Sequence, residues 1–473
     1  MTSHKLLILI ILLCPALWLT AQVDAHYWTH QYGAKGLLLN GAVIASAEGE
    51  TSLFYNPGSI GIGDDLGFAF SFLSPAYSNL QVRNIIGDDN VIRDTGLGFS
   101  PGFLGIRFKP FKSERFVAGV TAFERFRTEI SFEDRVVDRV NQGNERLFSG
   151  DLDFSRRISE DWYGIGLACS ITENIGIGIT QFSVWHSQAL AFRLNKEIVP
   201  TLSPANVLLA WQRGFSYNLS FQSGFVTKLG IRIKQDDWNL GFTVTSPTYG
   251  IIRSSARYTI DDLRVNVESD SFTNFSNRND VTLQEFRTPL SVGAGLDISL
   301  GEDNVISISM EYFGQVGRHK IFEDIDDRFD GLAPDSLITI SVLENSSQSV
   351  FNIALGYYKK TSEKVTLLFG ARTDFDQNNN LRLNSTTEYL GTTGNVFHIS
   401  GGGSFNYGRN QFSMGMDLAY GRRDNGSQLV DLSDIDMDNF FLLNGRNNVS
   451  SRFFAVSLFV TYDFIFSGIT SVK

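Results

Sequence analysis

Two histidines near the N-terminus have a spacing that suits metal binding. His26 and His30 lie four residues apart in the segment HYWTH, so on a helix their imidazoles would share one face. A stable transition-metal site needs at least a third ligand, and the surrounding pattern offers none. We favour the simpler interpretation that Tyr27 and Trp28 pack this segment against the rest of the fold, and we predict no metal site.

The segment DFDQNNN carries oxygen ligands at alternate positions, as calcium loops do. Such a loop also requires glycine at its sixth position and glutamate at its twelfth, and both are missing after Asp374, Asp376, Asn378 and Asn380. A solvated hairpin tip is the better interpretation. The acidic stretches FEDIDDRFDG and DLSDIDMDN could bridge divalent cations at a lipopolysaccharide surface, although soluble loop faces are the simpler explanation.

No catalytic pattern accompanies the remaining histidines. A nucleophile, a base and an orienting carboxylate would have to converge in space, and no sequence motif places such a nucleophile. We therefore predict that the protein is not an enzyme and uses no cofactor. We expect surface or luminal positions for His26, His30, His186, His319 and His398.

The first residues read as an export signal. Lys5 precedes the apolar run Leu6–Leu13, and Leu19-Thr20-Ala21 ends near a small residue, as in a cleaved signal peptide over residues 1–21. A retained signal anchor is the alternative. Cys14 follows Leu12-Leu13 rather than small residues, so we do not expect lipidation. Cys169 then remains the only cysteine, and no intrachain disulfide is possible.

Composition narrows the class of protein. The formal net charge of −11 argues against nucleic acid as a partner, and no apolar run of about 18 residues follows the signal to form a helical membrane span. The chain is 13% aromatic and contains 44 glycines and 39 phenylalanines. This combination, scattered through alternating segments, suits one large β-structure whose outer face meets lipid.

Many segments alternate with the period of two that strands require. One apolar face holds Tyr163, Ile165, Leu167, Cys169 and Ile171, and similar faces run through residues 292–300, 412–420 and 454–464. A β-sandwich would also alternate, but it would divide into domains of about 100 residues. The opposite faces are rich in Gly, Ser and Thr with occasional charges such as Arg232, Asp297 and Arg372, which is typical of a polar barrel lumen.

The connections alternate between tight turns and long polar stretches, as in outer-membrane barrels. Six tight turns pair twelve strands, and one further strand at each end predicts a 14-stranded antiparallel transmembrane β-barrel. The tight turns are Lys109–Ser113, Thr172–Asn174, Gln235–Asp237, Gly301–Asn304, Thr361–Glu363 and Gly408–Asn410. Long loops are expected at 75–99, 128–150, 195–207, 261–280, 322–347, 378–394 and 424–450.

Residues 22–64 precede the first expected strand and end in the stretch GETSLFYNPGSIG. This stretch resembles the N-terminal signature of the FadL-type outer-membrane transporters of long-chain fatty acids and other hydrophobic compounds. Ser52, Phe54, Tyr55, Asn56 and Pro57 match the signature, while Gly58 replaces the usual alanine and is expected to make the turn more flexible. The resemblance implies a fourteen-stranded barrel with an N-terminal hatch in its lumen.

The resemblance also implies a passive channel with a lateral exit through the wall, made by an inward kink in the third strand. That strand is expected over residues 115–127, RFVAGVTAFERFR, and Gly119 is its candidate kink point because glycine in a strand marks bends. The competing interpretation is a small luminal residue that relieves crowding. The hatch residues Phe54, Tyr55, Asn56, Pro57 and Gly58 are the candidate substrate-binding or gating residues.

The prediction is therefore an all-β protein of the Gram-negative outer membrane with a small N-terminal luminal hatch. Its parts are a signal peptide (1–21), a hatch (22–64), a barrel (65–464) and a periplasmic extension (465–473). The expected function is uptake of hydrophobic small molecules, and the alternative is a structural or surface-interaction barrel with a sealed lumen. Expected partners are the solute, outer-membrane lipid and lipopolysaccharide, and the barrel assembly machinery, with the chain itself a monomer.

Overall fold

The computed structural model describes most of the chain beyond the export signal. It covers residues 26–62, 66–71, 74–100, 102–110, 115–142, 144–200, 207–252, 255–282, 286–320, 344–377, 394–426, 428, 430–435, 440–441, 445–446 and 448–466. Residues 1–25 and 467–473 lie outside this range, so the signal peptide and most of the C-terminal extension remain predictions.

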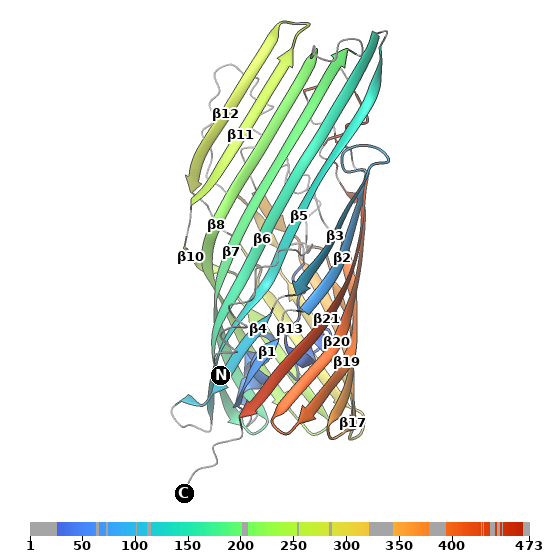
Figure 1. The fold of residues 1–473 in the computed structure, drawn as a ribbon. Coiled ribbons are helices and arrows are strands. Elements are labelled where there is room, and N and C mark those ends of the chain that lie inside the picture. The colour runs from blue at the N-terminus through green and yellow to red at the C-terminus, as the bar shows by residue number, and fades with distance from the viewer. Residues whose placement is uncertain are drawn as a thin grey trace, which may run out of the picture.

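The chain forms a closed antiparallel barrel with fourteen strands around its wall (Figure 1). Six of the wall strands are each composed of two or three of the labelled strands, namely β1 with β2, β3 with β4, β9 with β10 and β11, β12 with β13, β14 with β15, and β16 with β17. The last strand closes the wall on the first, from Leu66 opposite Phe466 to Arg83 opposite Ser450. Closure removes the sheet edges that hydrocarbon cannot solvate.

The strand bounds are β1 (Leu66–Ser71), β2 (Ser74–Arg83), β3 (Val91–Ser100), β4 (Phe103–Phe108), β5 (Phe116–Gln142), β6 (Asn144–Thr172), β7 (Ile175–Pro200), β8 (Leu209–Lys234), β9 (Trp238–Thr245), β10 (Tyr249–Ile252), β11 (Ser255–Asn266), β12 (Ser271–Thr282), β13 (Ser291–Ser299), β14 (Asn304–Phe313), β15 (Val316–Lys320), β16 (Glu344–Ser347), β17 (Val350–Ser362), β18 (Val365–Asp374), β19 (Asn395–Tyr407), β20 (Asn410–Gly426) and β21 (Val449–Phe466). The first wall strand thus begins at Leu66, one residue after the expected start of the barrel at residue 65.

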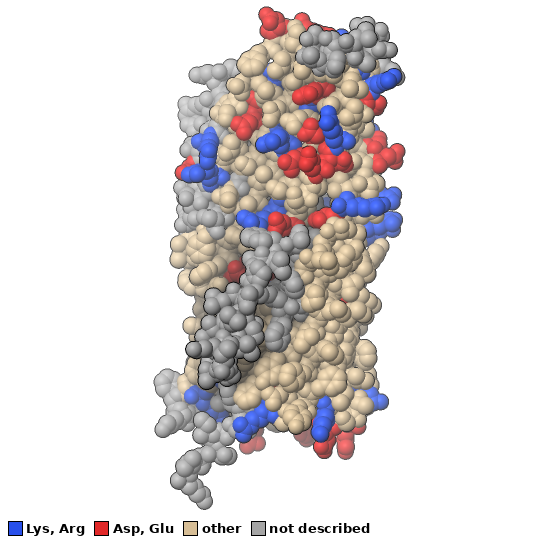
Figure 2. Space-filling view, viewed as in Figure 1, with Lys and Arg blue, Asp and Glu red and all other residues tan. Residues whose placement is uncertain are grey.

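The lower outer wall faces lipid, as the alternation predicts. On β6, Tyr163, Ile165, Leu167 and Ile171 are 43%, 70%, 44% and 59% exposed, whereas Ala168 between them is buried. Figure 2 shows, beside the grey region, a broad band with almost no charged side chains over the lower half of the barrel, bounded by charges above and below. Because the short turns close the lower end, that end is periplasmic and the upper end is extracellular.

Several predicted loops are wrong, because strands continue through them. Residues 75–99 form the hairpin of β2 and β3, residues 128–150 lie mostly in β5 and β6, and residues 261–280 lie mostly in β11 and β12. Figure 1 shows β5–β8, β11 and β12 rising well beyond β2, β3 and β19–β21. Above the membrane the outer face of these strands meets water, so polar residues occupy it. The sequence of the extracellular strand segments is therefore as polar as that of a loop.

The extracellular parts of β5–β8, β11 and β12 enclose an apolar core of their own. Their inward side chains include Phe148, Leu152 and Phe154, all at most 2% exposed, and Val430, Leu432 and Phe440 from the connection between β20 and β21 join the same core. The extracellular extension is therefore packed inside, with its polar residues outside.

The N-terminal segment forms short helical turns rather than strands. These are α2 (Gly33–Leu38), the 3₁₀ turn η1 (Gly49–Thr51), α3 (Ser52–Tyr55) and the 3₁₀ turn η2 (Pro57–Gly61). Glycine at 33 and 49 adopts positive φ values of 69° and 64°, which suit glycine. In the described part of the chain, no helix is long and apolar enough to cross a membrane.

Candidate binding lumen and its hatch

Residues 26–62, called the hatch below, fill the lower lumen of the barrel. Most of their side chains are buried, and they contact wall strands on several sides. Ile44 N donates to Ser309 Oγ on β14 at 3.0 Å, and Ser400 Oγ on β19 donates to the carbonyl oxygen of Leu38 at 2.8 Å. The expected luminal position of the N-terminal segment is seen for these residues.

Asn56 organises the Asn-Pro-Gly turn at the end of α3. Its Oδ1 accepts from Gly58 N at 3.0 Å, which caps the turn in the way that asparagine favours. Its Nδ2 donates to the carbonyl oxygens of Ile44 at 2.8 Å and Ile231 at 3.0 Å. Pro57 occupies the first position of η2, where its missing N–H costs nothing.

Gly58 lies where no side chain fits. A Cβ at Gly58 would lie 2.8 Å from three backbone atoms of the wall, namely Arg232 N, Gly176 O and Gly230 O. The wall also lacks side chains where it contacts this turn, because Cβ atoms at Gly178 and Gly230 would collide with Pro57 and Asn56. Glycine at 58 therefore permits direct backbone packing of η2 on β7 and β8, rather than a looser turn.

Phe54 and Tyr55 anchor an aromatic cluster between the hatch and the wall. The Phe54 ring lies 5.2 Å from Tyr32, 5.0 Å from Phe123 and 6.4 Å from Trp162, in edge-on geometry that aromatic pairs prefer. The Tyr55 hydroxyl donates to Gln31 Oε1 at 2.9 Å and accepts from Tyr32 N at 2.8 Å. Both expected hatch aromatics thus contact the rest of the hatch or the wall.

Two cations flank Phe54. The Arg125 guanidinium lies 5.4 Å and the Lys228 ammonium 5.1 Å from the centre of the Phe54 ring, within the range of cation–π attraction. Arg125 also stacks over Trp162 at 5.7 Å and donates to the carbonyl oxygen of Tyr27. The site therefore combines an apolar aromatic surface with two positive charges.

Gly119 and the irregularity of β5 lie at different places. Gly119 pairs in regular register with Arg107 and Gly166, and a Cβ there would lie 2.9 Å from Leu53 Cδ1 in the hatch. The register of β5 against β6 shifts between Glu124 and Phe126. Arg125 therefore lies at a bulge, where strands bend, and the role of Gly119 as a kink stays a prediction.

The backbone ladder between the second and third wall strands ends at this bulge. β4 pairs with β5 up to Phe103 opposite Phe123. Among the described residues no backbone pairing joins β3 to residues 124–142 of β5, although Asn90 donates to Asp134 near the top. We call this stretch the unpaired seam.

The unpaired seam begins beside the hatch aromatics and borders the lipid-facing band. Phe123 is a member of the aromatic cluster, and the Tyr32 hydroxyl donates to the carbonyl oxygen of Glu124 at 2.7 Å. On the β3 side Leu97 is 73% exposed and pairs with lipid-facing Tyr77 of β2. A buried aromatic site and an exposed apolar strand edge thus flank the same seam.

A polar network holds the opposite side of the hatch. Arg372 of β18 donates to Asn40 Oδ1 at 2.5 Å and to the carbonyl oxygen of Thr29 at 2.9 Å. Its neighbour His398 lies 3.0 Å from Asp417 Oδ2, and Asn40 Nδ2 donates to Asp417 at 3.2 Å. Arg372 and Asp417 are therefore hydrogen-bonded to both side-chain and backbone atoms of the hatch.

The two N-terminal histidines have opposite electrostatic environments. Burial lowers the pKa of His26, but the Asp374 carboxylate, 3.7 Å away, outweighs burial and raises that pKa above 6.5. Burial, reinforced by Arg372 and Arg125, lowers the pKa of His30 to about 3. Both imidazoles are buried, and among the described residues no group of three or more candidate ligands could hold a metal ion.

The remaining candidate residues that the structure describes contact other parts of the fold. Asp374 accepts from Trp28 N at 3.2 Å, and Asp376 pairs with Arg423 at 3.6 Å, while Asn378 and Asn380 lie outside the described residues. His186 stacks on Phe286 at 5.1 Å. Sequence reasoning placed Arg372 in the lumen but did not predict its contacts with the hatch, and it missed Arg125 and Lys228, because an inward charge in a strand carries no local signature of its partner.

These features define a class of protein: an outer-membrane β-barrel with an N-terminal hatch in its lumen. No protein-family model matches the chain, and no curated protein matches its sequence. Solved structures do match. The Pseudomonas putida toluene transporter TodX is 14% identical with a TM-score of 0.58, covering 96% of this chain and 100% of its own.

Two further structures agree. The CymD monoaromatic hydrocarbon channel is 13% identical with a TM-score of 0.54, over 92% of this chain and 98% of its own. A Pseudomonas aeruginosa FadL homologue is 11% identical with a TM-score of 0.58, over 94% and 100%. The resemblance to FadL-type proteins is thereby confirmed for the fold. Barrels with this fold belong to the outer membrane of Gram-negative bacteria.

Proposed function

We propose that this protein is a passive outer-membrane channel for hydrophobic small molecules. The observation that carries the proposal is the unpaired seam beside the aromatic cluster of the hatch. An apolar solute gains little from a water-filled pore and more from a route that leads through an apolar site into lipid. The solved structures with the same fold include a toluene transporter and a monoaromatic hydrocarbon channel, which supports this class of solute.

The route has three parts in this proposal. Solute enters the apolar interior of the extracellular extension, binds against Phe54, Phe123 and Trp162, and leaves sideways through the unpaired seam. The hatch blocks the direct path to the periplasm. No step requires a cofactor, an energy source or a catalytic group, and we propose no enzymatic activity.

A sealed structural barrel is the second candidate. Its support is the number of hydrogen bonds between hatch and wall, which involve β8, β14, β18 and β19. In such a barrel the seam would be a static irregularity without consequence for permeation.

Cross-linking across the seam separates the two candidates. Cysteines replace Thr95 on β3 and Ser131 on β5, both exposed on the outer face, in a Cys169→Ser background, and a bismaleimide joins them. Entry of a fluorescent hydrophobic probe, N-phenyl-1-naphthylamine, into liposomes is then measured. We expect the linker to reduce the probe flux at least fivefold.

The matched control joins two strands that are already paired. Ser159 and Ser187 face each other on β6 and β7, with their Oγ atoms 2.8 Å apart, so cysteines and the same linker there should leave the flux unchanged. Equal flux before and after cross-linking at residues 95 and 131 would reject the lateral route. Flux no higher than that of protein-free liposomes in every variant would favour the sealed barrel.

A further inference from the structure

Four arginines form a row on the outer face of the barrel. Arg93 of β3 lies opposite Gln81 of β2, Gln81 lies opposite Arg452 of β21, and Arg452 lies opposite Arg422 of β20. Arg83 follows Gln81 by two residues on the same face. All four arginines are exposed. We call Arg83, Arg93, Arg422 and Arg452 the arginine row.

The arginine row lies directly above the lipid-facing band. Tyr420 and Phe454 are register partners, two residues nearer the periplasmic end, and are 51% and 42% exposed. Phe397 of β19 lies opposite Tyr420 and is 52% exposed. Such an aromatic girdle marks the membrane interface, so the arginines lie about 7 Å beyond it along the strands, at the level of lipid headgroups in the outer leaflet.

The row carries more positive charge than its surroundings neutralise. Arg422 pairs with Asp424 at 3.0 Å. Within the described part of the chain, no carboxylate forms an ion pair with Arg83, Arg93 or Arg452. Like charges on neighbouring strands repel one another, and an anion bound between them would remove that cost.

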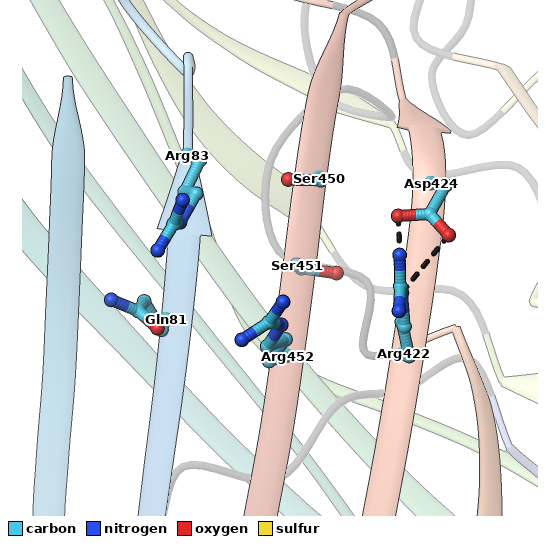
Figure 3. Close-up of a pocket in the computed structure, with 7 residues that line it drawn as sticks. All are labelled: Gln81, Arg83, Arg422, Asp424, Ser450, Ser451 and Arg452. Carbon is cyan, nitrogen blue, oxygen red and sulfur yellow. Dashed lines mark hydrogen bonds and ion pairs between the residues drawn. The ribbon is translucent and has the colours of Figure 1, made fainter. Parts of the chain in front are cut away.

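The side chains enclose a small cleft lined with hydrogen-bond donors. Figure 3 shows the lining residues on three neighbouring strands: Gln81 and Arg83 on β2, Ser450, Ser451 and Arg452 on β21, and Arg422 on β20, which is turned towards Asp424. The cleft has a volume of about 60 Å³. Guanidinium groups bind phosphate oxygens in pairs, and the amide and hydroxyl groups add further donors.

We propose that this cleft binds a phosphate group of lipopolysaccharide in the outer leaflet. A lipid is favoured over a free anion because an apolar surface continues directly below the cleft. Leu418, Met416 and Leu458 are 36%, 40% and 53% exposed on β20 and β21, in position to contact acyl chains while the arginines hold the headgroup. The inference does not depend on the transport proposal, since it concerns the outside of the wall.

The test compares two triple variants that lose the same charge. Arg83→Ala/Arg93→Ala/Arg452→Ala removes the unpaired members of the row. Arg135→Ala/Arg139→Ala/Arg257→Ala removes exposed arginines of the extracellular extension. Binding of rough lipopolysaccharide to each purified barrel in nonionic detergent is measured by microscale thermophoresis, and heat-modifiable gel mobility reports correct folding.

We expect the first variant to bind at least tenfold more weakly than the unmodified protein and the second to bind equally well. Dephosphorylated lipopolysaccharide should bind the unmodified protein at least tenfold more weakly, and equimolar inorganic phosphate should not compete. Equal binding by the unmodified protein and the first variant, or equal losses in both variants, would overturn the proposal. Full competition by inorganic phosphate would assign the cleft to a free anion instead.

Discussion

The Asn56 amide nitrogen donates to the carbonyl oxygen of Ile231 at 3.0 Å, so a single side chain ties the hatch turn to wall strand β8. The same nitrogen donates to Ile44, and the amide oxygen accepts from Gly58. Asn56 therefore links the conformation of the Asn-Pro-Gly turn to the docking of this part of the hatch, and both should weaken when it is replaced.

Asn56→Ala should loosen the hatch while the barrel still forms. The substitution removes three hydrogen bonds and leaves buried partners unsatisfied, and each such loss costs about 1–3 kcal/mol. Hydrogen–deuterium exchange should show faster exchange in residues 49–62 and unchanged exchange in β6 and β7. Asn174→Ala, in the exposed turn between β6 and β7, is the control. Equal protection of the hatch in both variants would disprove this role for Asn56.

Gly58→Ala should weaken the docking of η2, although alanine is common at this position in FadL-type signatures. The new methyl group would lie 2.8 Å from three wall backbone atoms, and such overpacking costs about 1–3 kcal/mol. The measurement is the protection of residues 57–61 against exchange. Gly317→Ala, where a Cβ meets nothing within 4 Å, should have no effect on the hatch.

Leu167→Arg should impair insertion of the barrel into lipid. The side chain is 44% exposed on the lipid-facing side of β6, and arginine there costs about 2–4 kcal/mol near the membrane midplane. Folding into vesicles, followed by gel mobility, gives the free-energy difference. Ser155→Arg lies on the same face of the same strand above the lipid band, and normal insertion is expected for it. Normal insertion of both would mean that β6 does not face lipid.

The pH dependence of hatch docking should reverse sign between two histidine variants. The raised pKa of His26 means that its protonated form stabilises the docked hatch below pH 6.5, and this contribution is lost as pH rises through the raised value. The lowered pKa of His30, about 3, means that docking is favoured above pH 6.5 and loses up to about 1.4 kcal/mol per pH unit below it.

His30→Gln should therefore dock its hatch more firmly at pH 5.5 than at pH 8.5, and His26→Gln should do the reverse. Exchange protection factors of the hatch, corrected for the intrinsic effect of pH, measure both. His319→Gln, on β15 and outside the hatch, is the control and should behave as the unmodified protein does. Identical pH profiles in all three variants would show that neither buried imidazole is linked to docking.

The membrane-embedded wall could be predicted from sequence because two local signals agree there. Alternation places Leu167 and its neighbours outside, and the tight turn at residues 172–174 fixes the hairpin of β6 and β7. The extracellular strands resemble loops in the sequence because their polar residues face water. Their inward residues Phe148, Leu152 and Phe154 still keep the period of two, which is the signal that would have revealed them.

The luminal contacts could not be predicted, since they join residues far apart in the chain. Arg372 donates a hydrogen bond to Asn40, which lies 332 positions away in the chain. The sequence around either residue gives no indication of this partner. Gly58 illustrates the same limit. A glycine in a turn suggests conformational freedom, and only the fold reveals that Gly176 and Gly230 of the wall require its missing side chain.

The outward residues of β6 mark the level on the barrel wall at which the membrane ends. Its outward residues change from Tyr163 to Asp161 within one period of the strand, while its inward residues stay mostly apolar through both levels. Vertical position is thus encoded in side-chain chemistry alone, independently of the fold. Exchanging the outward residues of all the wall strands one period further up would shift the barrel by about 7 Å relative to the bilayer, and the seam would move with it.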